Sequence, residues 1–132
     1  MEKIIVYSDG GSRGNPGPAG IGIVIGKENT ISKYIGPATN NQAEYTAVIE
    51  ALKWLAENKT GDIEVEFYLD SQLVVEQLNQ RYKLKNEGLK PLFWQIRDLV
   101  MKIGGRVSFQ YIPREKNKEA DKLANLAMDK GK

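Results

Sequence analysis

Hydrophobic and polar positions alternate with a period of two in the first third of the chain. Residues 3–8 read Lys-Ile-Ile-Val-Tyr-Ser and are rich in β-branched and aromatic side chains, which favours a strand. Isoleucine at every second position predicts another strand over residues 21–25, and a third follows over residues 30–35 after a polar turn. Residues 9–20 are rich in Gly and Pro and are predicted to form a turn. Three strands with short connections predict an antiparallel meander.

The hydrophobic period then changes. Apolar residues recur at three- and four-residue spacing from Asn41 onward, which predicts an amphipathic helix over residues 41–58 with Asn40 as its N-cap. Alternation returns at residues 63–69, which predicts a strand with one apolar face. The next pattern predicts a short helix that is capped by Asp70-Ser71 and runs to about Asn79. A helix, a strand and a last helix are then predicted over residues 91–103, 107–111 and 117–130.

The order of these elements is β-β-β-α-β-α-α-β-α. A meander followed by alternating strands and helices predicts an α/β fold, a five-stranded mixed sheet flanked by helices. The sequence contains no linker, internal repeat or low-complexity segment. We therefore expect residues 1–132 to form a single domain.

Two residue types are missing, and their absence narrows the chemistry. The 132 residues include no Cys and no His. This excludes thiolate nucleophiles, zinc knuckles, Ser-His-Asp triads and His-ligated metals. A metal ion bound here would meet oxygen ligands, which favours magnesium, manganese or calcium.

The sequence shows neither a membrane-spanning segment nor a secretory signal. No apolar run approaches the roughly 18 residues that a membrane span needs. The apolar run at the N-terminus is too short for a secretory signal, because Asp9 closes it. We therefore expect a cytoplasmic protein that does not associate with membranes.

Charge is unevenly distributed, although the net charge is only +2. Residues 62–76 hold five acids and no base, whereas residues 81–118 hold ten bases and three acids. A solvated surface explains this pattern. A surface that faces a polyanion beside an acidic centre explains it equally well.

Four acids stand at the edges of predicted elements. Asp9 follows the first strand and Asp70 follows the fourth. Glu44 lies in the first turn of the first helix, and Asp121 lies early in the last. Sites in open α/β sheets gather beyond the carboxyl ends of parallel strands, so Asp9 and Asp70 are expected side by side. Grouped carboxylates repel one another unless a cation joins them, which predicts one or two magnesium ions and phosphoryl-transfer chemistry.

Each acid also has a structural explanation when taken alone. Asp9 precedes two glycines, as is typical of a turn, and Asp70 can cap a helix. Glu44 and Asp121 complement the dipoles of their helices. The acids therefore point to a metal site as a group rather than singly.

The glycine-rich segment after the first strand admits two interpretations. It does not match the phosphate-binding loop of nucleotide-binding proteins. Gly10 and Gly11 would let the backbone approach a sugar–phosphate chain closely, which makes them candidate substrate-binding residues. A tight hairpin turn explains the same glycines.

Four sequence blocks together resemble type 1 ribonuclease H. They occur in the family's order, lie on the expected elements and cover nearly the whole chain. The blocks are Asp9-Gly10-Gly11-Ser12 with Asn15-Pro16-Gly17-Pro18-Ala19-Gly20, Thr39-Asn40-Asn41-Gln42-Ala43-Glu44, Leu69-Asp70-Ser71-Gln72, and Glu119-Ala120-Asp121-Lys122-Leu123-Ala124.

The resemblance implies an endoribonuclease that cleaves the RNA strand of RNA–DNA hybrids and leaves 5′-phosphate and 3′-hydroxyl ends. It implies two Mg²⁺ ions, with Mn²⁺ as a substitute, held by Asp9, Glu44, Asp70 and Asp121. In that scheme Asp9 bridges both ions. Glu44 and Asp70 complete the site on the leaving-group side, and Asp121 completes the other.

The same resemblance implies a set of substrate contacts. Asn15, Asn40 and Gln72 stand where the family contacts RNA 2′-hydroxyls and minor-groove edges. Thr39, with Asn40, lies near its pocket for a DNA-strand phosphate. The expected partner is the hybrid duplex itself, bound by a monomer that needs no other protein.

This chain departs from the best-known family pattern in two places. Many members carry a His in the loop before the last acid, whereas this loop has none, and Arg114 is our candidate catalytic substitute. The basic protrusion of some members is reduced to residues 81–90. Two other functions remain open: a metal-dependent nuclease of the same fold that cuts duplex RNA or DNA, and a non-catalytic hybrid-binding module.

Overall fold

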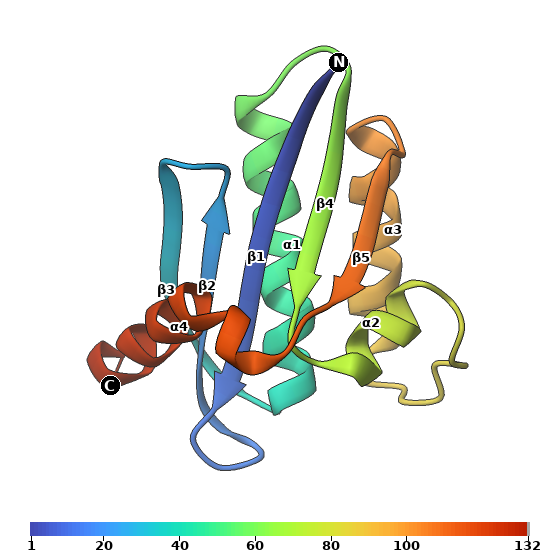
Figure 1. Ribbon diagram of the computed structural model, residues 1–132. Coiled ribbons are helices and arrows are strands. Elements are labelled where there is room, and N and C mark those ends of the chain that lie inside the picture. Colours follow the sequence, from blue (N-terminus) through green and yellow to red (C-terminus); the bar gives the residue numbers. More distant parts are fainter. Residues whose placement is uncertain (132) are drawn as a thin grey trace.

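The computed structural model describes residues 1–131, which form five strands, four α-helices and one short 3-10 helix. The elements follow the chain in the order that the hydrophobic pattern predicts (Figure 1). They are β1 (Glu2–Ser12), β2 (Gly17–Ile25), β3 (Asn29–Ala38), α1 (Asn40–Asn58), β4 (Ile63–Leu69), α2 (Gln72–Leu78), α3 (Lys90–Lys102), β5 (Val107–Tyr111), η1 (Arg114–Lys116) and α4 (Lys118–Lys130).

The strands of the described region form one mixed sheet in the order β3-β2-β1-β4-β5. β1, β2 and β3 pair antiparallel as the predicted meander, and β4 and β5 are added parallel to β1. The predicted α/β fold is confirmed. β1 lies at the centre of the sheet, with β2 on one side and β4 on the other.

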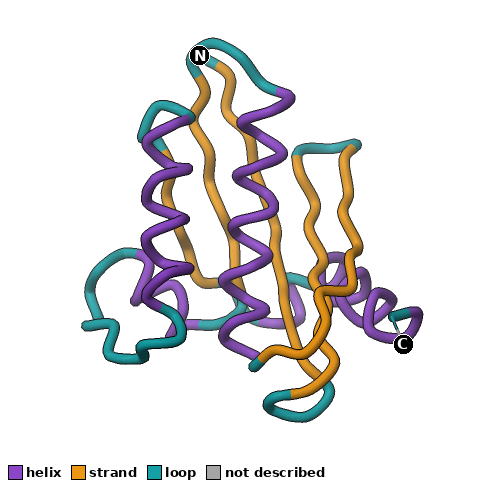
Figure 2. The backbone as a smooth tube through the Cα atoms, turned by 180° about the vertical axis from the view of Figure 1, so that it is seen from behind, coloured by secondary structure: helices purple, strands orange, loops and turns teal. Residues whose placement is uncertain are grey.

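Helices cover the two faces of the sheet unequally. α1 and α3 lie side by side on one face (Figure 2). α4 crosses the other face over β1, β2 and β3 (Figure 1). Val6, Phe67 and Leu52 are fully buried in one apolar cluster that joins the sheet to α1. No helix within residues 1–131 combines the length and the apolar character that a membrane crossing requires.

The first strand is longer than predicted, and the following turn is shorter. β1 continues past Asp9 to Ser12 and pairs with β2, so residues 13–16 alone connect the two strands. Two glycines of the predicted turn, Gly10 and Gly20, lie in strands and serve close packing. A Cβ at Gly10 would collide with the backbone of Ala43 in α1, and one at Gly20 would lie 2.8 Å from the carbonyl oxygen of Ala124 in α4.

The N-cap of α1 is Thr39, not Asn40 as predicted. The Thr39 hydroxyl accepts a hydrogen bond from the Gln42 amide at 3.1 Å, and the Gln42 side chain accepts one from the Thr39 amide at 2.9 Å. This reciprocal capping box satisfies two amides that the helix itself leaves without partners.

Later elements differ from prediction by one or two residues. α2 is capped by Ser71, one of the two residues predicted to cap it, and the Ser71 hydroxyl accepts from the Val74 amide at 3.3 Å. α3 begins at Lys90 and α4 at Lys118, each one residue from its predicted start, and the short helix η1 over Arg114–Lys116 was not predicted. Asp121 therefore lies in the first turn of α4.

Candidate active site

Two of the predicted acids come together through the register of parallel strands. β1 and β4 are paired as far as Tyr7 and Tyr68. Asp9 lies two residues beyond that pair inside β1, and Asp70 lies two residues beyond it directly after β4. Asp9 thus does not end its strand as predicted, but it reaches the same edge as Asp70 because the β1–β4 pairing stops before it.

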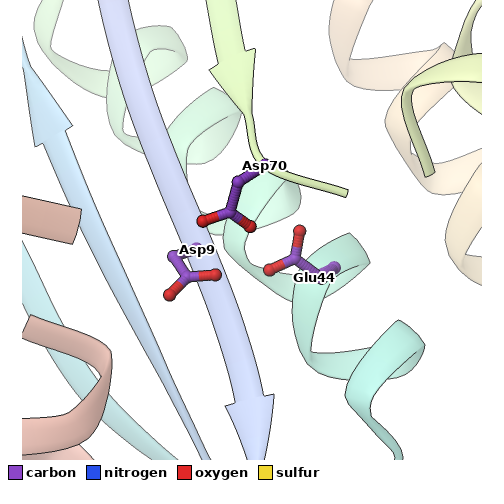
Figure 3. Close-up of side chains that lie close together, drawn as sticks. All are labelled: Asp9, Glu44 and Asp70. Carbon is purple, nitrogen blue, oxygen red and sulfur yellow. The ribbon is translucent and has the colours of Figure 1, made fainter. Parts of the chain in front are cut away.

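Glu44 adds a third carboxylate from α1. One oxygen from each of Asp9, Glu44 and Asp70 lies within 4.8 Å of the others (Figure 3). Glu44 lies just past the first turn of its helix instead of within it as predicted, because α1 begins at Asn40, and it is 5% exposed. Its Oε1 accepts a hydrogen bond from the Gly10 amide at 2.5 Å, which fixes the side chain against β1.

Within residues 1–131, the second carboxylate oxygen of Glu44 has no group that would offset the cost of its burial. Glu44 Oε2 is buried and has no hydrogen-bond partner among the described residues. A buried, unpartnered carboxylate oxygen is costly unless a cation meets it. Three carboxylates with no nitrogen or sulfur donor form the kind of ligand set that hard divalent cations prefer.

Burial and mutual repulsion act on the protonation of these groups. Burial raises the pKa of Asp9 to about 7, and the charges of Asp70 and Asp121 add to the effect. Burial also raises the pKa of Glu44 well above its usual value, as does the neighbouring Asp9. The pKa of Asp70 is raised by burial and lowered in part by a hydrogen bond from Asn117.

Asp121 approaches the cluster from α4 and completes the predicted set of four acids. It lines the same cleft as Asp9, Glu44 and Asp70, which has a volume of about 410 Å³. The Asn125 amide donates to Asp121 Oδ1 at 3.4 Å. Arg114 Nη2, from η1, lies at 3.4 Å from the same oxygen. The predicted catalytic residues therefore share one cleft.

The predicted substrate-binding residues, unlike the predicted catalytic residues, do not all line the acidic cleft. Gly10, Gly11 and Asn40 line the cleft. Asn15 is not among the lining residues, but its side-chain oxygen accepts from the Asn40 amide at 3.0 Å.

Two further members of that predicted set do not line the acidic cleft. Thr39 caps α1 through its hydroxyl, and Gln72 is exposed in the first turn of α2.

Asn117 is a site residue that sequence reasoning missed. It is 1% exposed, and its amide donates to the Ser8 carbonyl at 3.0 Å and to Asp70 Oδ2 at 3.2 Å. One side chain thereby ties the start of α4 to β1 and to a site carboxylate. The available signal is an Asn four residues before Asp121, a pattern equally typical of an ordinary helix start.

The ten bases of residues 81–118 do not form one surface. Arg114 lines the acidic cleft. Lys102 and Arg106 line a different cleft at the opposite end of the sheet, beside the loop between α1 and β4 (Figure 1). A third cleft, between α2 and α3, is lined by side chains that include Arg81, Tyr82, Lys83, Lys90 and Trp94.

Known proteins share this geometry. The family model described as "Reverse transcriptase-like" matches residues 7–127. An RNase H1 isolated from compost by a metagenomic approach is 50% identical, with a TM-score of 0.92 and 98% of each chain covered. That compost protein has also been solved in complex with an RNA/DNA hybrid, and this structure has a TM-score of 0.91, 48% identity and coverage of 96% and 97%.

Sequence comparison finds relatives of the same kind as the structural comparison. A ribonuclease H of Ruthia magnifica is 36% identical over 98% of each chain. A bifunctional protein of Mycobacterium tuberculosis is 42% identical over 96% of this chain, which spans 36% of that longer protein. With the strand order, the acidic cleft and these matches in agreement, the chain belongs to the type 1 ribonuclease H family.

Proposed function

We propose that this chain is an endonuclease that hydrolyses the RNA strand of RNA–DNA hybrids and leaves 5′-phosphate and 3′-hydroxyl ends. The observation that carries the proposal is the meeting of four carboxylates from β1, α1, β4 and α4 at one cleft. The relatives named ribonuclease H and the hybrid complex of the compost protein support the choice of substrate.

The proposed cofactor is a pair of Mg²⁺ ions held by Asp9, Glu44, Asp70 and Asp121, with Mn²⁺ as a substitute. The oxygen-only donor set and the unpartnered Glu44 Oε2 support this assignment. Bound divalent cations supply neutralisation of the charge on the attacking and leaving oxygens of a phosphodiester.

The remaining proposed roles belong to groups of the protein itself. A guanidinium offers donors and no acceptor, so the proposed role of Arg114 is to hold the scissile phosphate and not to act as a base. Asn117 keeps Asp70 oriented toward the cleft. Amide side chains discriminate RNA from DNA through the 2′-hydroxyl. The proposed substrate contacts are Gly10, Gly11, Asn15, Thr39, Asn40 and Gln72.

We also propose that the protein acts as a monomer in the cytoplasm. One chain supplies all four carboxylates, so a second copy adds nothing that the site lacks. Its proposed substrate is an intracellular nucleic acid.

A magnesium titration of cleavage tests the function. End-labelled RNA–DNA hybrid, duplex RNA and duplex DNA of one sequence are incubated with the protein at increasing Mg²⁺ concentration. We expect metal-dependent cleavage of the RNA strand of the hybrid, with 5′-phosphate ends on the products. Preferred cleavage of another duplex would favour a related nuclease of the same fold. Binding without cleavage at any Mg²⁺ or Mn²⁺ concentration would indicate a hybrid-binding module.

A further inference from the structure

Within residues 1–131, two arginine–aspartate pairs connect α4 to the rim of the acidic cleft. Arg114 Nη2 lies 3.4 Å from Asp121 Oδ1, and Arg13 Nη2 lies 2.5 Å from Asp129 Oδ1. Both arginines line the cleft that contains the acids. Arg13 reaches it from the connection between β1 and β2, a segment in which the sequence motifs mark no charged functional residue.

The backbone that carries Arg13 is fixed in place. The Arg13 amide donates to the Pro18 carbonyl at 2.8 Å, which closes the connection. The Ser12 amide donates to Asn40 Oδ1 at 2.9 Å, which ties the same segment to the start of α1. The guanidinium is therefore presented at the cleft from a well-supported backbone.

The Arg13 side chain has unused binding capacity. A guanidinium has five N–H donors, and the contact with Asp129, an ion pair through Nη2 alone, uses at most one of them. The side chains of Arg13 and Asp129 are 48% and 59% exposed, and exposed ion pairs contribute little to stability. A phosphate, which accepts two parallel hydrogen bonds from arginine, can compete with Asp129 for this group.

The spacing of the two pairs suits a nucleic-acid strand. Asp121 and Asp129 are eight residues apart on α4. At a rise of 1.5 Å per residue, they are separated by about 12 Å along the helix axis. A strand carries one phosphate per roughly 3.4 Å of duplex axis, so this separation covers about three or four phosphates.

We propose that Arg13 binds a phosphate of the RNA strand, within about four nucleotides of the bond that is cut. Asp129 holds the guanidinium toward the cleft in the free protein and is displaced when the strand enters. This inference rests on the proposed function, because it assumes that the scissile strand lies across the four acids. The competing explanation is structural: the pair merely ties the β1–β2 connection to α4.

Opposite effects of two substitutions separate these explanations. Binding of a short RNA–DNA hybrid is measured in EDTA, where no metal-dependent cleavage takes place. We expect Arg13→Gln to weaken binding about tenfold and to reduce the slope of log affinity against log salt by about 1. Asp129→Asn is expected to tighten binding, because it frees the arginine.

Matched controls remove the effect of net charge alone. Arg106→Gln and Asp62→Asn make the same charge changes at the cleft on the opposite end of the sheet. We expect both to change affinity far less than their counterparts. Equal weakening by Arg13→Gln and Asp129→Asn would show a structural tie and overturn the inference, as would an Arg13→Gln protein that binds like Arg106→Gln.

A phosphate scan then locates the contact. Single phosphates of either strand are replaced by uncharged methylphosphonates. One position of the RNA strand is expected to weaken binding of the wild-type protein while leaving Arg13→Gln unaffected. A contact on the DNA strand, or none, would contradict the proposal. Cleavage of the unmodified hybrid in Mg²⁺ is recorded in parallel: failure to cleave would count against the proposed function, whereas the binding scan still decides the role of Arg13.

Discussion

Asp9, Glu44 and Asp70 are carboxylates placed where ionisation is unfavourable. Burial is the first cause of the raised pKa of each group, and neighbouring acids add to it. The fold thus bears an electrostatic cost at this position that a divalent cation would relieve. The side chains are nevertheless held in place, Glu44 by the Gly10 amide and Asp70 by Asn117.

Asp9→Asn and Asp70→Asn are therefore expected to separate activity from stability. Each removes a proposed ligand, so hybrid cleavage should fall below about a tenth of the wild-type rate, a barrier increase of at least roughly 1.4 kcal/mol. Melting temperature in EDTA should stay level or rise, because a repelling charge is lost. Asp98→Asn, on an exposed position of α3, serves as control. A variant that keeps more than a tenth of the activity would remove that residue from the essential ligands.

Stability of the metal-free protein should fall as pH rises. The native Asp9 has a pKa of about 7 against an ordinary value of 3.8, so in this interval the native state holds a proton that the unfolded chain has lost. The unfolded state then binds fewer protons, and the free energy of unfolding decreases with pH. Thermal unfolding in EDTA at pH 5 and pH 8 measures the effect. Asp9→Asn should flatten the dependence, and a wild-type protein that gains stability toward pH 8 would contradict this expectation.

Arg114 is the residue whose proposed role departs most from the family pattern. We expect Arg114→Ala to lower kcat about 10- to 1000-fold, the range for loss of a modest contact up to a full transition-state donor. Lys should rescue activity only in part, because its charge is a point rather than a planar fork. Single-turnover kinetics at saturating protein and two salt concentrations provide the measurement. An unchanged kcat with weaker binding that low salt restores would assign Arg114 to general attraction alone.

The helices depend on glycines for their approach to the sheet. Gly10 in β1 gives α1 room to approach, and Gly20 and Gly22 in β2 do the same for α4. Since Glu44 lies on α1 and Asp121 on α4, the distance of each helix from the sheet also sets the position of a site carboxylate. The packing of α1 and α4 against these glycines therefore also sets where Glu44 and Asp121 lie.

Gly22→Ala tests this coupling from β2, at the position that pairs with Asp9 in β1. The added Cβ would collide with the carbonyl oxygen of Ala120, so α4 must shift. We expect a loss of about 1–3 kcal/mol in the free energy of unfolding, together with a lower kcat because Asp121 moves. Denaturant unfolding and cleavage rates measure the two effects. Gly88→Ala, where the nearest atom is the flexible Asn86 side chain at 3.2 Å, is the matched control and should change neither.

Across the whole molecule, positive charge is divided among clefts instead of spread over one face. Lys102 and Arg106 lie at the end of the sheet remote from the acids. Arg81 and Lys90 are paired with Glu76 and Glu87. Within residues 81–90, Lys83 and Lys85 are exposed and form no ion pair with described residues, so they are the bases of this stretch that are free to contact phosphates.

Hybrid binding should therefore depend steeply on salt and little on sequence. Log affinity is expected to fall linearly with log salt, and Lys83→Gln with Lys85→Gln should reduce the slope by nearly 2 if both contact phosphates. The double variant Lys102→Gln with Arg106→Gln has the same net charge and should reduce it less. Affinity that is independent of salt, or that favours one sequence strongly, would overturn this account of recognition.

The order and type of the elements could be predicted from the sequence, because hydrophobic period is a local property. Alternation from Ile63 to Leu69 requires a strand with one buried face, and the three- and four-residue spacing after Asn41 requires a helix. The absence of Cys and His, a matter of composition alone, limits the site to oxygen ligands. Even the correct cap of α1 is encoded locally, since Thr39 and Gln42 match the capping-box spacing.

The sequence predicts that Asp9 and Asp70 lie side by side, but the geometry of this and the other contacts between distant residues was decided by the tertiary structure. Asp9 meets Asp70 because the β1–β4 register stops two residues short of both, and Glu44 meets them because Gly10 lets α1 lie close to β1. Asn117 contacts Ser8 across a separation of 109 residues, which no local pattern encodes. Hydrophobic period predicts which face of an element is buried, but register and helix position follow from how all side chains pack together, and these set the geometry of the site.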